Sequence, residues 1–302
     1  MIFKPKKSIL EQVDVPNENV QLYLKREDKI HDFVSGNKYR KLKYNLLEAK
    51  RLGFKTLLTF GGAYSNHIAA VAAAGNYLGL CTIGVIRGEE LKGNFLENPT
   101  LNFAEQHGMR FKFVSRAAYR EKTSDAFLEG LKKDFGDFYL IPEGGTNLLA
   151  VKGCEEILED ISLEFDYICC AVGTGGTLSG LINCSKPSQQ VLGFPALKGS
   201  FLREDIVKFV KQTNWDLITD YHFGGYAKIN LDLIKFINQF KQNTKIPLDP
   251  IYTGKMMFGV FDLIEKGFFP KGSRILAIHT GGLQGIEGMN IKLKKMNLPI
   301  IT

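Results

Sequence analysis

The chain has 302 residues, of which 44% are hydrophobic and 24% charged, a composition typical of a folded globular protein with an ample core. Its net charge is +7, but the cations are spread along the whole length without a long block of like charge. The sequence contains no zinc-finger spacing and no aromatic RNP-type motif. We therefore expect a small anionic ligand and no nucleic-acid partner.

The five cysteines argue for a reducing compartment. They include no CxxC pair, and Cys169 and Cys170 are neighbours inside an apolar run. That pattern favours reduced, buried thiols and a cytoplasmic location. The first ten residues, "MIFKPKKSIL", lack the apolar core of a signal peptide, and every apolar run is too short to span a bilayer. We expect no membrane partner and no metal site.

Short apolar runs alternate with helical patterns along most of the chain. The runs are rich in β-branched and aromatic residues and have the length of strands, which predicts parallel α/β construction. The predicted strands span 56–60, 81–86, 110–114, 167–172, 190–194 and 274–279, and the predicted helices span 68–79, 98–108 and 124–135. Glycines stand where helix C-caps are expected, at Gly53, Gly79, Gly108 and Gly136.

Three of the predicted strands run directly into glycine-rich turns. The turns read "GGAYSNH" at 61–67, "GTGGTLSG" at 173–180 and "TGG" at 280–282. Ligands of open α/β sheets collect at the carboxyl ends of strands. We therefore predict one shared site that is assembled from three distant segments.

The turn at 173–180 has the composition of an anion-binding loop. Glycines allow backbone N–H groups to turn toward an anion, and the helix that follows adds its positive end. A tight turn without a ligand is about equally compatible with this loop alone. No lysine stands where a Walker loop needs one, and no acidic residue follows before Glu204 to bind a ribose. A small cofactor with one phosphate fits better than a nucleotide.

Ser65, Asn66 and His67 stand at the predicted start of a helix. Ser and Asn are favoured N-caps, but capping accounts for one residue and not for three. A carboxylate-binding site would use the same hydroxyl, amide and backbone donors, so we favour ligand contact, while His67 alone is equally compatible with a structural role. Tyr252 and Thr280 lie in two further segments, where packing and turn capping are the ordinary explanations.

The stretch "SGNKYRKLKY" at 35–44 places four cations behind a turn. Lys38, Arg40, Lys41 and Lys43 could form a patch for an anionic partner or a solvated helix face, or include a lysine with covalent chemistry. A reactive lysine must be partly deprotonated, and burial and neighbouring cations both favour the neutral amine.

These segments together resemble a known family. "SGNKYRKLKY", "GGAYSNH", "IPEGGTN", "GTGGTLSG", "VLGFPALKG", "DPIYTGK" and "HTGG" occur in the order found in the pyridoxal-phosphate enzymes D-cysteine desulfhydrase and 1-aminocyclopropane-1-carboxylate (ACC) deaminase. The resemblance runs from about residue 24 to 285. It implies fold type II, like the tryptophan synthase β-subunit, with two α/β domains, largely parallel sheets and the cofactor in the cleft between them. It also implies a homodimer and a small amino-acid substrate.

The resemblance implies a role for each matching residue at the cofactor, pyridoxal 5′-phosphate. Lys38 matches the lysine that forms the Schiff base, and Lys41 matches a second lysine placed near the phosphate. We predict that Arg40 and Lys43 belong to a solvated helix face. Asn66 matches the asparagine that hydrogen-bonds the ring hydroxyl, and Thr280 stands where a side chain can reach the ring nitrogen. The implied phosphate cup consists of Gly173, Thr174, Gly175, Gly176 and Thr177.

The resemblance also implies substrate-binding and catalytic residues. Ser65, with Asn66 and His67, matches the loop that grips the substrate carboxylate, and Ser65 and Tyr252 match catalytic residues. Tyr226 in "GGYAKIN" is a weaker match to a second active-site tyrosine. We predict residues 1–40 and 149–302 as the large cofactor-binding domain and residues 41–148 as the smaller one.

Two positions favour D-cysteine over ACC as the substrate. The deaminases carry a Glu after the tyrosine, in a YEGK sequence that would keep the ring nitrogen protonated, whereas this chain has Thr253 there. They also tend to have an apolar residue where this chain has Thr280. We therefore predict α,β-elimination from a D-amino acid, with ACC ring opening as the alternative. A non-catalytic cofactor-binding protein and a polyanion binder are the rivals from other classes.

Overall fold

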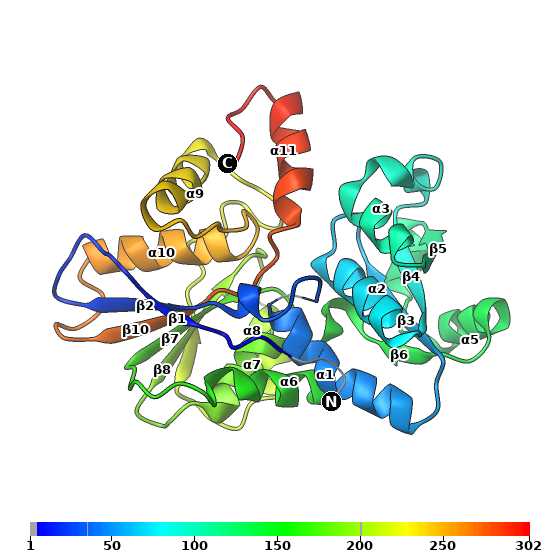
Figure 1. Ribbon diagram of the computed structural model, residues 1–302, viewed down its shortest axis with the longest axis horizontal. Coiled ribbons are helices and arrows are strands. Elements are labelled where there is room, and N and C mark those ends of the chain that lie inside the picture. Colours follow the sequence, from blue (N-terminus) through cyan, green and yellow to red (C-terminus); the bar gives the residue numbers. More distant parts are fainter. Residues whose placement is uncertain (1–4, 35, 200) are drawn as a thin grey trace.

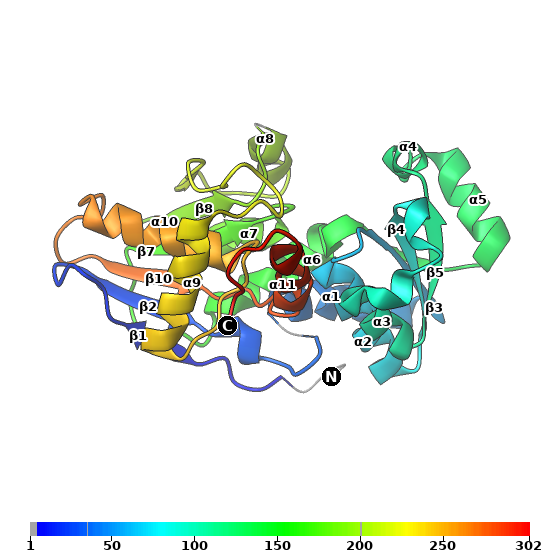
Figure 2. The ribbon, with the colours of Figure 1, turned by 90° about the horizontal axis from the view of Figure 1, so that it is seen from above.

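The computed structural model describes residues 5–34, 36–199 and 201–302. Ser35, which opens the "SGNK" motif, and the first four residues of the predicted large domain lie outside the described residues. The chain forms two lobes, each built around its own sheet (Figures 1 and 2). In the described part of the chain, no helix has the length and apolar character that a membrane crossing requires.

The large lobe contains a six-stranded sheet in which only the first two strands pair antiparallel. Its order is β1 (Leu10–Val13), β2 (Gln21–Lys25), β10 (Arg274–Ile278), β7 (Tyr167–Val172), β8 (Gln190–Pro195) and β9 (Trp215–Leu217). One face packs against α9 (Leu231–Thr244), α10 (Thr253–Glu265) and α11 (Gly285–Lys295). The other packs against α6 (Leu148–Glu155), α7 (Gly176–Cys184) and α8 (Phe201–Val207). Such two-sided cover explains why the central strands are almost wholly apolar.

The small lobe contains a four-stranded sheet that is parallel throughout. Its order is β5 (Met109–Val114), β4 (Cys81–Arg87), β3 (Thr56–Gly61) and β6 (Tyr139–Ile141). One face packs against α1 (Asn37–Arg51), α2 (Asn66–Leu78) and α3 (Pro99–Gln106), and the other against α4 (Arg116–Arg120) and α5 (Asp125–Phe135).

The predicted α/β construction is confirmed. All six predicted strands and all three predicted helices are present, with ends that differ by at most two residues. The four predicted C-cap glycines all have positive φ, between 66° and 80°. The predictions do not include β1, β2, β6 and β9, because these strands have three to five residues and show too little pattern.

The domain division stays a prediction. Its break between residues 148 and 149 falls at the start of α6, whereas its break between residues 40 and 41 falls inside α1, which continues to Arg51. In Figure 1, α1 lies at the base of the molecule between the two lobes, and α11 lies near its top.

The start of α1 is pinned to the loop that follows β10. The backbone N–H of Asn37 donates to the carbonyl of Thr280 at 3.1 Å. Gly36 has a φ of +63°, and a Cβ there would lie 1.9 Å from the same carbonyl oxygen. Only glycine therefore permits this turn, and the turn fixes the direction in which the lysines of α1 point.

Candidate active site

A cavity of about 680 Å³ lies between the lobes, and the three glycine-rich turns line it. The turns follow β3 of the small sheet and β7 and β10 of the large sheet, so the predicted meeting of three distant segments is confirmed. The predicted site residues that line the cavity are Lys38, Lys41, Ser65, Asn66, His67, Gly173, Thr174, Gly175, Thr177, Tyr226, Tyr252 and Thr280. Gly176 lies just behind the wall, where a Cβ would meet Thr146 at 2.8 Å and Lys41 at 3.2 Å.

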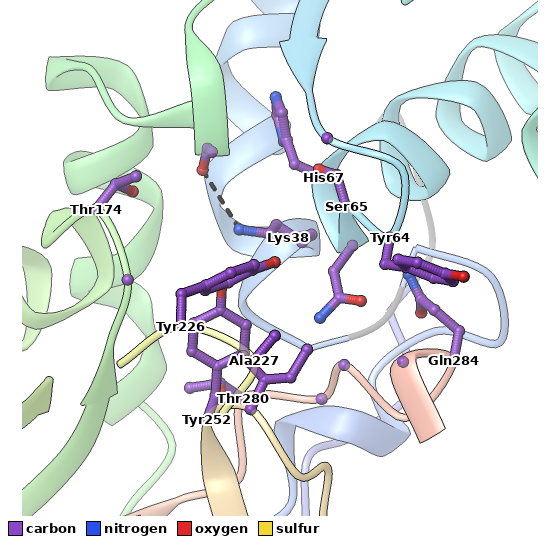
Figure 3. Close-up of a pocket in the computed structure, with 18 of the residues that line it drawn as sticks. Lys38, Tyr64, Ser65, His67, Thr174, Tyr226, Ala227, Tyr252, Thr280 and Gln284 are labelled. Carbon is purple, nitrogen blue, oxygen red and sulfur yellow. Dashed lines mark hydrogen bonds between the residues drawn. The ribbon is translucent and has the colours of Figure 1, made fainter. Parts of the chain in front are cut away.

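Lys38 projects from the first turn of α1 into the cavity (Figure 3). Its Nζ donates to the carbonyl of Gly144 at 3.3 Å. Within the described ranges, no carboxylate lies in ion-pair distance of this ammonium. Burial, and then the nearby charge of Lys41, lower the pKa of Lys38 well below its usual value. The amine therefore has access to the neutral form that a nucleophile or base requires.

Lys41 lies one turn further along α1 and is held by three oxygens. Its Nζ donates to the Gly144 carbonyl at 2.9 Å, to Thr146 Oγ1 at 2.8 Å and to Thr174 Oγ1 at 3.3 Å. Burial lowers its pKa to about 8. The sequence prediction missed Thr146, although "IPEGGTN" had been recognised as one of the family segments. Its hydroxyl lies 2.5 Å from that of Thr174, so this segment joins the anion-binding turn to α1.

The turn before α7 has the geometry of an anion site. Gly175 is the N-cap with a φ of +82°, and a Cβ there would lie 2.8 Å from Ile206 Cγ1. No side chain caps the N-terminus of the nine-residue helix α7, and the turn before it lines the cavity, so the free N–H groups of the first helical turn are available to an anion there. Asn37 of α1 donates to Thr177 Oγ1 at 2.9 Å, which fixes the two helix N-termini against each other.

The other two cations of α1 differ from the prediction of a solvated helix face. Arg40 is mostly buried and forms two hydrogen bonds with Glu27, at 2.8 and 3.1 Å. Glu27 is completely buried. Lys43 donates to both oxygens of Glu156 at 2.6 Å and keeps about a third of its side chain exposed. The prediction was wrong for Arg40, because α1 packs against segments that carry these carboxylates.

Ser65 caps α2 and still lines the cavity. Its Oγ accepts from the backbone N–H of Ile68 at 3.3 Å, so Ser65 is the one residue of the three that acts as the helix N-cap. Asn66 follows with a buried amide oxygen that has no hydrogen-bond partner in the described part of the chain. Ser65 lies close to Lys38 (Figure 3), and Asn66 lines the same cavity.

His67 is turned into the small lobe and is only 2% exposed. The Thr59 hydroxyl donates to the Ile141 carbonyl at 2.8 Å, so it must accept from His67 Nε2, also at 2.8 Å. The proton is therefore on Nε2, and Nδ1 is an acceptor without a partner among the described residues. Burial and the charges of Lys38 and Lys41 lower the pKa of His67 well below its usual value. The imidazole is neutral, and its role in substrate binding stays a prediction.

Tyr252 is positioned by the first turn of α10. The buried carboxylate of Asp249 accepts from the backbone N–H groups of Ile251, Tyr252 and Thr253 at 2.8–2.9 Å. The Tyr226 ring lies 6.3 Å from that of Tyr252, nearly edge-on, at the cavity wall (Figure 3). Burial raises the pKa of both tyrosines, so both hydroxyls are protonated and can donate at neutral pH.

The two threonines singled out in the sequence have different environments. Thr253 is completely buried, and its hydroxyl donates to Asp249 at 2.7 Å, so it does not line the cavity. Thr280 does line the cavity. The sequence reasoning did not single out several further lining residues, including Tyr64, Arg87, Glu143 and Gln284, because each is a single polar residue in a loop or at an element end.

The cavity offers pyridoxal 5′-phosphate suitable groups at three points. The Lys38 amine would meet the aldehyde, the turn before α7 would hold the phosphate, and Asn66 would bind the ring hydroxyl. A buried amide oxygen without a partner is rare, so the Asn66 oxygen indicates a polar ligand group at that point. The residues present therefore fit the cofactor.

Comparison with known proteins gives the same class. The model of the family described as pyridoxal-phosphate dependent enzyme matches residues 10–281, and the chain belongs to this family. A crystal structure of an ACC deaminase homologue has a TM-score of 0.82 at 30% identity, and the match covers 97% of this chain and 94% of that one. The fold is fold type II, as the resemblance implied.

Two relatives by sequence are named for the activities considered above. A mitochondrial bifunctional D-cysteine desulfhydrase/1-aminocyclopropane-1-carboxylate deaminase of Arabidopsis thaliana is 31% identical, covering 90% of this chain and 74% of that protein. The D-cysteine desulfhydrase of Klebsiella pneumoniae (strain 342) is 27% identical, covering 87% of each chain. This chain is thus a pyridoxal-phosphate-dependent enzyme similar to lyases of these two kinds.

Proposed function

We propose that the protein catalyses α,β-elimination from a D-amino acid and converts D-cysteine to pyruvate, ammonia and hydrogen sulfide. The observation that carries this choice is that no acidic residue from the large lobe lines the cavity among the residues that the structure describes. Among the lining residues that the structure describes, the one carboxylate is Glu143, which comes from the small-lobe side. Thr253, in the place of the deaminase Glu, is turned away toward Asp249.

The bound cofactor supplies an electron sink for the pair left at Cα when the α-proton is removed. D-Cysteine has that proton and a good leaving group, so a moderate sink is sufficient. ACC has no α-hydrogen, and opening its ring calls for a protonated ring nitrogen. A neutral threonine hydroxyl can hydrogen-bond this nitrogen, but it cannot hold a full positive charge there.

The chain's own residues would divide the remaining work. Lys38 removes the α-proton with its neutral amine, the Cβ–S bond then breaks, and hydrosulfide leaves. Ser65 and the N-terminus of α2 hold the substrate carboxylate, and Lys41 neutralises charge beside the phosphate. Tyr252 and Tyr226 present protonated hydroxyls to the substrate side of the cavity. The released aminoacrylate hydrolyses to pyruvate and ammonia.

The decisive experiment is a substrate panel with the purified holoenzyme. D-Cysteine, L-cysteine, β-chloro-D-alanine and ACC are assayed for keto acid, with sulfide measured for the two cysteines. We expect keto acid and sulfide in equal amounts from D-cysteine, and much slower turnover of ACC. Faster turnover of ACC than of D-cysteine would support the deaminase function, which one relative combines with desulfhydrase activity.

Four further expectations belong to this proposal. We propose a cytoplasmic homodimer whose two lobes are the domains predicted above and which has no nucleic-acid partner. The family resemblance supports the dimer, and the cysteine pattern supports the location. Light scattering after size-exclusion chromatography measures the oligomeric state, and fractionation of the source cells measures the location. A monomeric holoenzyme would contradict the proposed assembly.

A further inference from the structure

The loop that carries Tyr226 has an unfavourable backbone conformation, with few hydrogen bonds of its own: the N–H groups of Gly225 and Lys228 donate to the carbonyls of His222 and Gly225 at 3.0 and 3.2 Å. Phe223, Gly224, Gly225 and Ala227 all have positive φ, at 53°, 88°, 113° and 54°. Phe223 and Ala227 are not glycines, so this conformation is unfavourable for them and persists only when the surroundings impose it. The loop forms no helix or strand, and Tyr226 is 41% exposed at its tip.

A buried lysine holds one side of this loop. Lys255 is 2% exposed, and its Nζ donates to the carbonyls of His222 at 2.9 Å and of Gly225 at 2.8 Å. Gly225 immediately precedes Tyr226. Because Lys255 follows Tyr252 by three residues on α10, the ammonium ties the Tyr226 backbone to the helix that Tyr252 begins.

A second lysine holds the other side. Lys292 of α11 donates to the carbonyl of Ala227, the residue that immediately follows Tyr226, at 3.0 Å. Lys292 is exposed, so this bond competes with water and is weaker than the buried one. Both carbonyls next to Tyr226 are therefore held by lysines from two different helices of the large lobe.

We propose that Lys255 is a positioning residue that sets the Tyr226 hydroxyl against Tyr252, and that Lys292 supports it as the weaker half of a two-lysine clamp. The inference rests on the proposed catalytic role of the tyrosine pair. A buried ammonium is costly, and in this place it adds a hydrogen bond to each of two carbonyls in a loop whose backbone conformation is unfavourable for Phe223 and Ala227. The substituted loop would still exist, but the phenol would sample many positions.

The test compares Lys255→Met and Lys292→Met with Lys228→Met in the full-length holoenzyme. Lys228 lies in the same loop and is exposed, and its side chain does not line the cavity, so it is the matched control. With whichever substrate the panel identifies, we expect kcat to fall on the order of tenfold to a hundredfold for Lys255→Met. Lys292→Met should lose about twofold to fivefold, and the control should stay unchanged.

A double-mutant cycle separates positioning from a general loss of stability. If Lys255 acts through Tyr226, then Lys255→Met should have little further effect on kcat in a Tyr226→Phe background. Equal losses in both backgrounds would overturn the proposal. Lys292 is exposed, so Lys292→Met should fold and can be tested even if Lys255→Met does not fold. Its double-mutant cycle with Tyr226→Phe is interpreted in the same way.

Hydrogen exchange gives a readout that needs no turnover. Amides of residues 222–228 should exchange faster in Lys255→Met than in the parent and the control, while the rest of the protein and its cofactor absorbance stay the same. Unchanged exchange in this loop would refute the clamp, whatever the substrate is. An inactive parent that shows the exchange difference would refute the proposed function and leave the clamp standing.

Discussion

Two sides of the first turns of α1 carry the same kind of side chain in opposite electrostatic settings. Lys38 and Lys41 face the cavity, where their Nζ atoms meet carbonyl and hydroxyl oxygens. Arg40 and Lys43 face Glu27 and Glu156. Burial lowers the pKa of both cavity lysines, to about 8 for Lys41. For Arg40, burial lowers the pKa, but the interaction with the carboxylate of Glu27 raises it by more, so the net shift is upward.

The difference shows that the hydrogen-bond partner of each basic side chain on α1 determines whether its charged form is favoured. A neutral oxygen can accept a hydrogen bond from an amine in either protonation state, so burial pushes the equilibrium toward the neutral amine. A carboxylate gains only from the charged form. One helix turn thus provides a reactive amine on one side and a fixed ion pair on the other.

The largest effect should follow from removing the reactive amine. In Lys38→Ala, turnover should fall by at least about a thousandfold, because the base that removes the α-proton is absent. The far-ultraviolet circular dichroism and the melting temperature should change little, because no ion pair is lost. Keto-acid assays measure the first expectation. Activity within tenfold of the parent would contradict the assignment of Lys38.

The next largest effect should appear on the paired side, and in stability instead of catalysis. Arg40→Met leaves the buried carboxylate of Glu27 without its partner, and we expect the free energy of unfolding to fall by about 3–5 kcal/mol. Lys43→Met, the matched control on the same side, should cost about 1 kcal/mol or less, because Lys43 is part exposed and Arg40 stays near Glu156. Urea denaturation measures both.

A second substitution sharpens the stability comparison. Adding Glu27→Gln to Arg40→Met removes the unpaired charge, so the double variant should be more stable than Arg40→Met alone. If the double variant were less stable than Arg40→Met by the full cost of a second lesion, the two residues would be energetically independent. That result would contradict the ion pair as the reason for the burial of Arg40.

Local pattern predicted much of this arrangement, and long-range contacts decided the rest. The strands, the cap glycines and the glycine-rich turns are properties of short segments. The ends of β7 and β10 meet because these strands are parallel neighbours in one sheet, whereas β3 belongs to the other sheet and reaches the cavity from the small lobe. The burial of Arg40 depends on Glu27, 13 residues away, and Lys43 depends on a carboxylate 113 residues away. Thr146 reaches Lys41 across 105 residues, and no local signal specifies that contact.

The direction of the Thr253 side chain at the start of α10 could not be predicted from the sequence either. Thr253 follows Tyr252 directly, and its identity invited comparison with a residue that faces the cofactor. Its hydroxyl instead bonds Asp249, because a carboxylate at a helix N-terminus is stabilised by the free N–H groups and draws nearby donors to it. Thr253 therefore contributes no group to the cavity lining.

The smallest predicted effect is a pH dependence that separates the two sides of α1. The pKa of Lys41 is about 8 in the folded cofactor-free protein and about 10.5 in the unfolded chain. Below pH 8 the amine is protonated in both states, and between these values the unfolded chain binds more protons. The contribution of Lys41 to stability should therefore rise with pH from 8 toward 10.5, by up to about 1.4 kcal/mol per pH unit.

Lys41→Met should remove this rise, whereas Lys43→Met should leave it in place. Urea denaturation of the cofactor-free proteins at pH 8.0 and 9.5 gives the difference, and the titration of unfolded tyrosines is common to all three and cancels. The drop in slope should be somewhat less than one proton, because the amine of Lys41 is already about half deprotonated in the folded parent at pH 8.0. Equal slopes in the parent and in Lys41→Met would mean that Lys41 stays charged, and the contrast between the two sides of α1 would then rest on Lys38 alone.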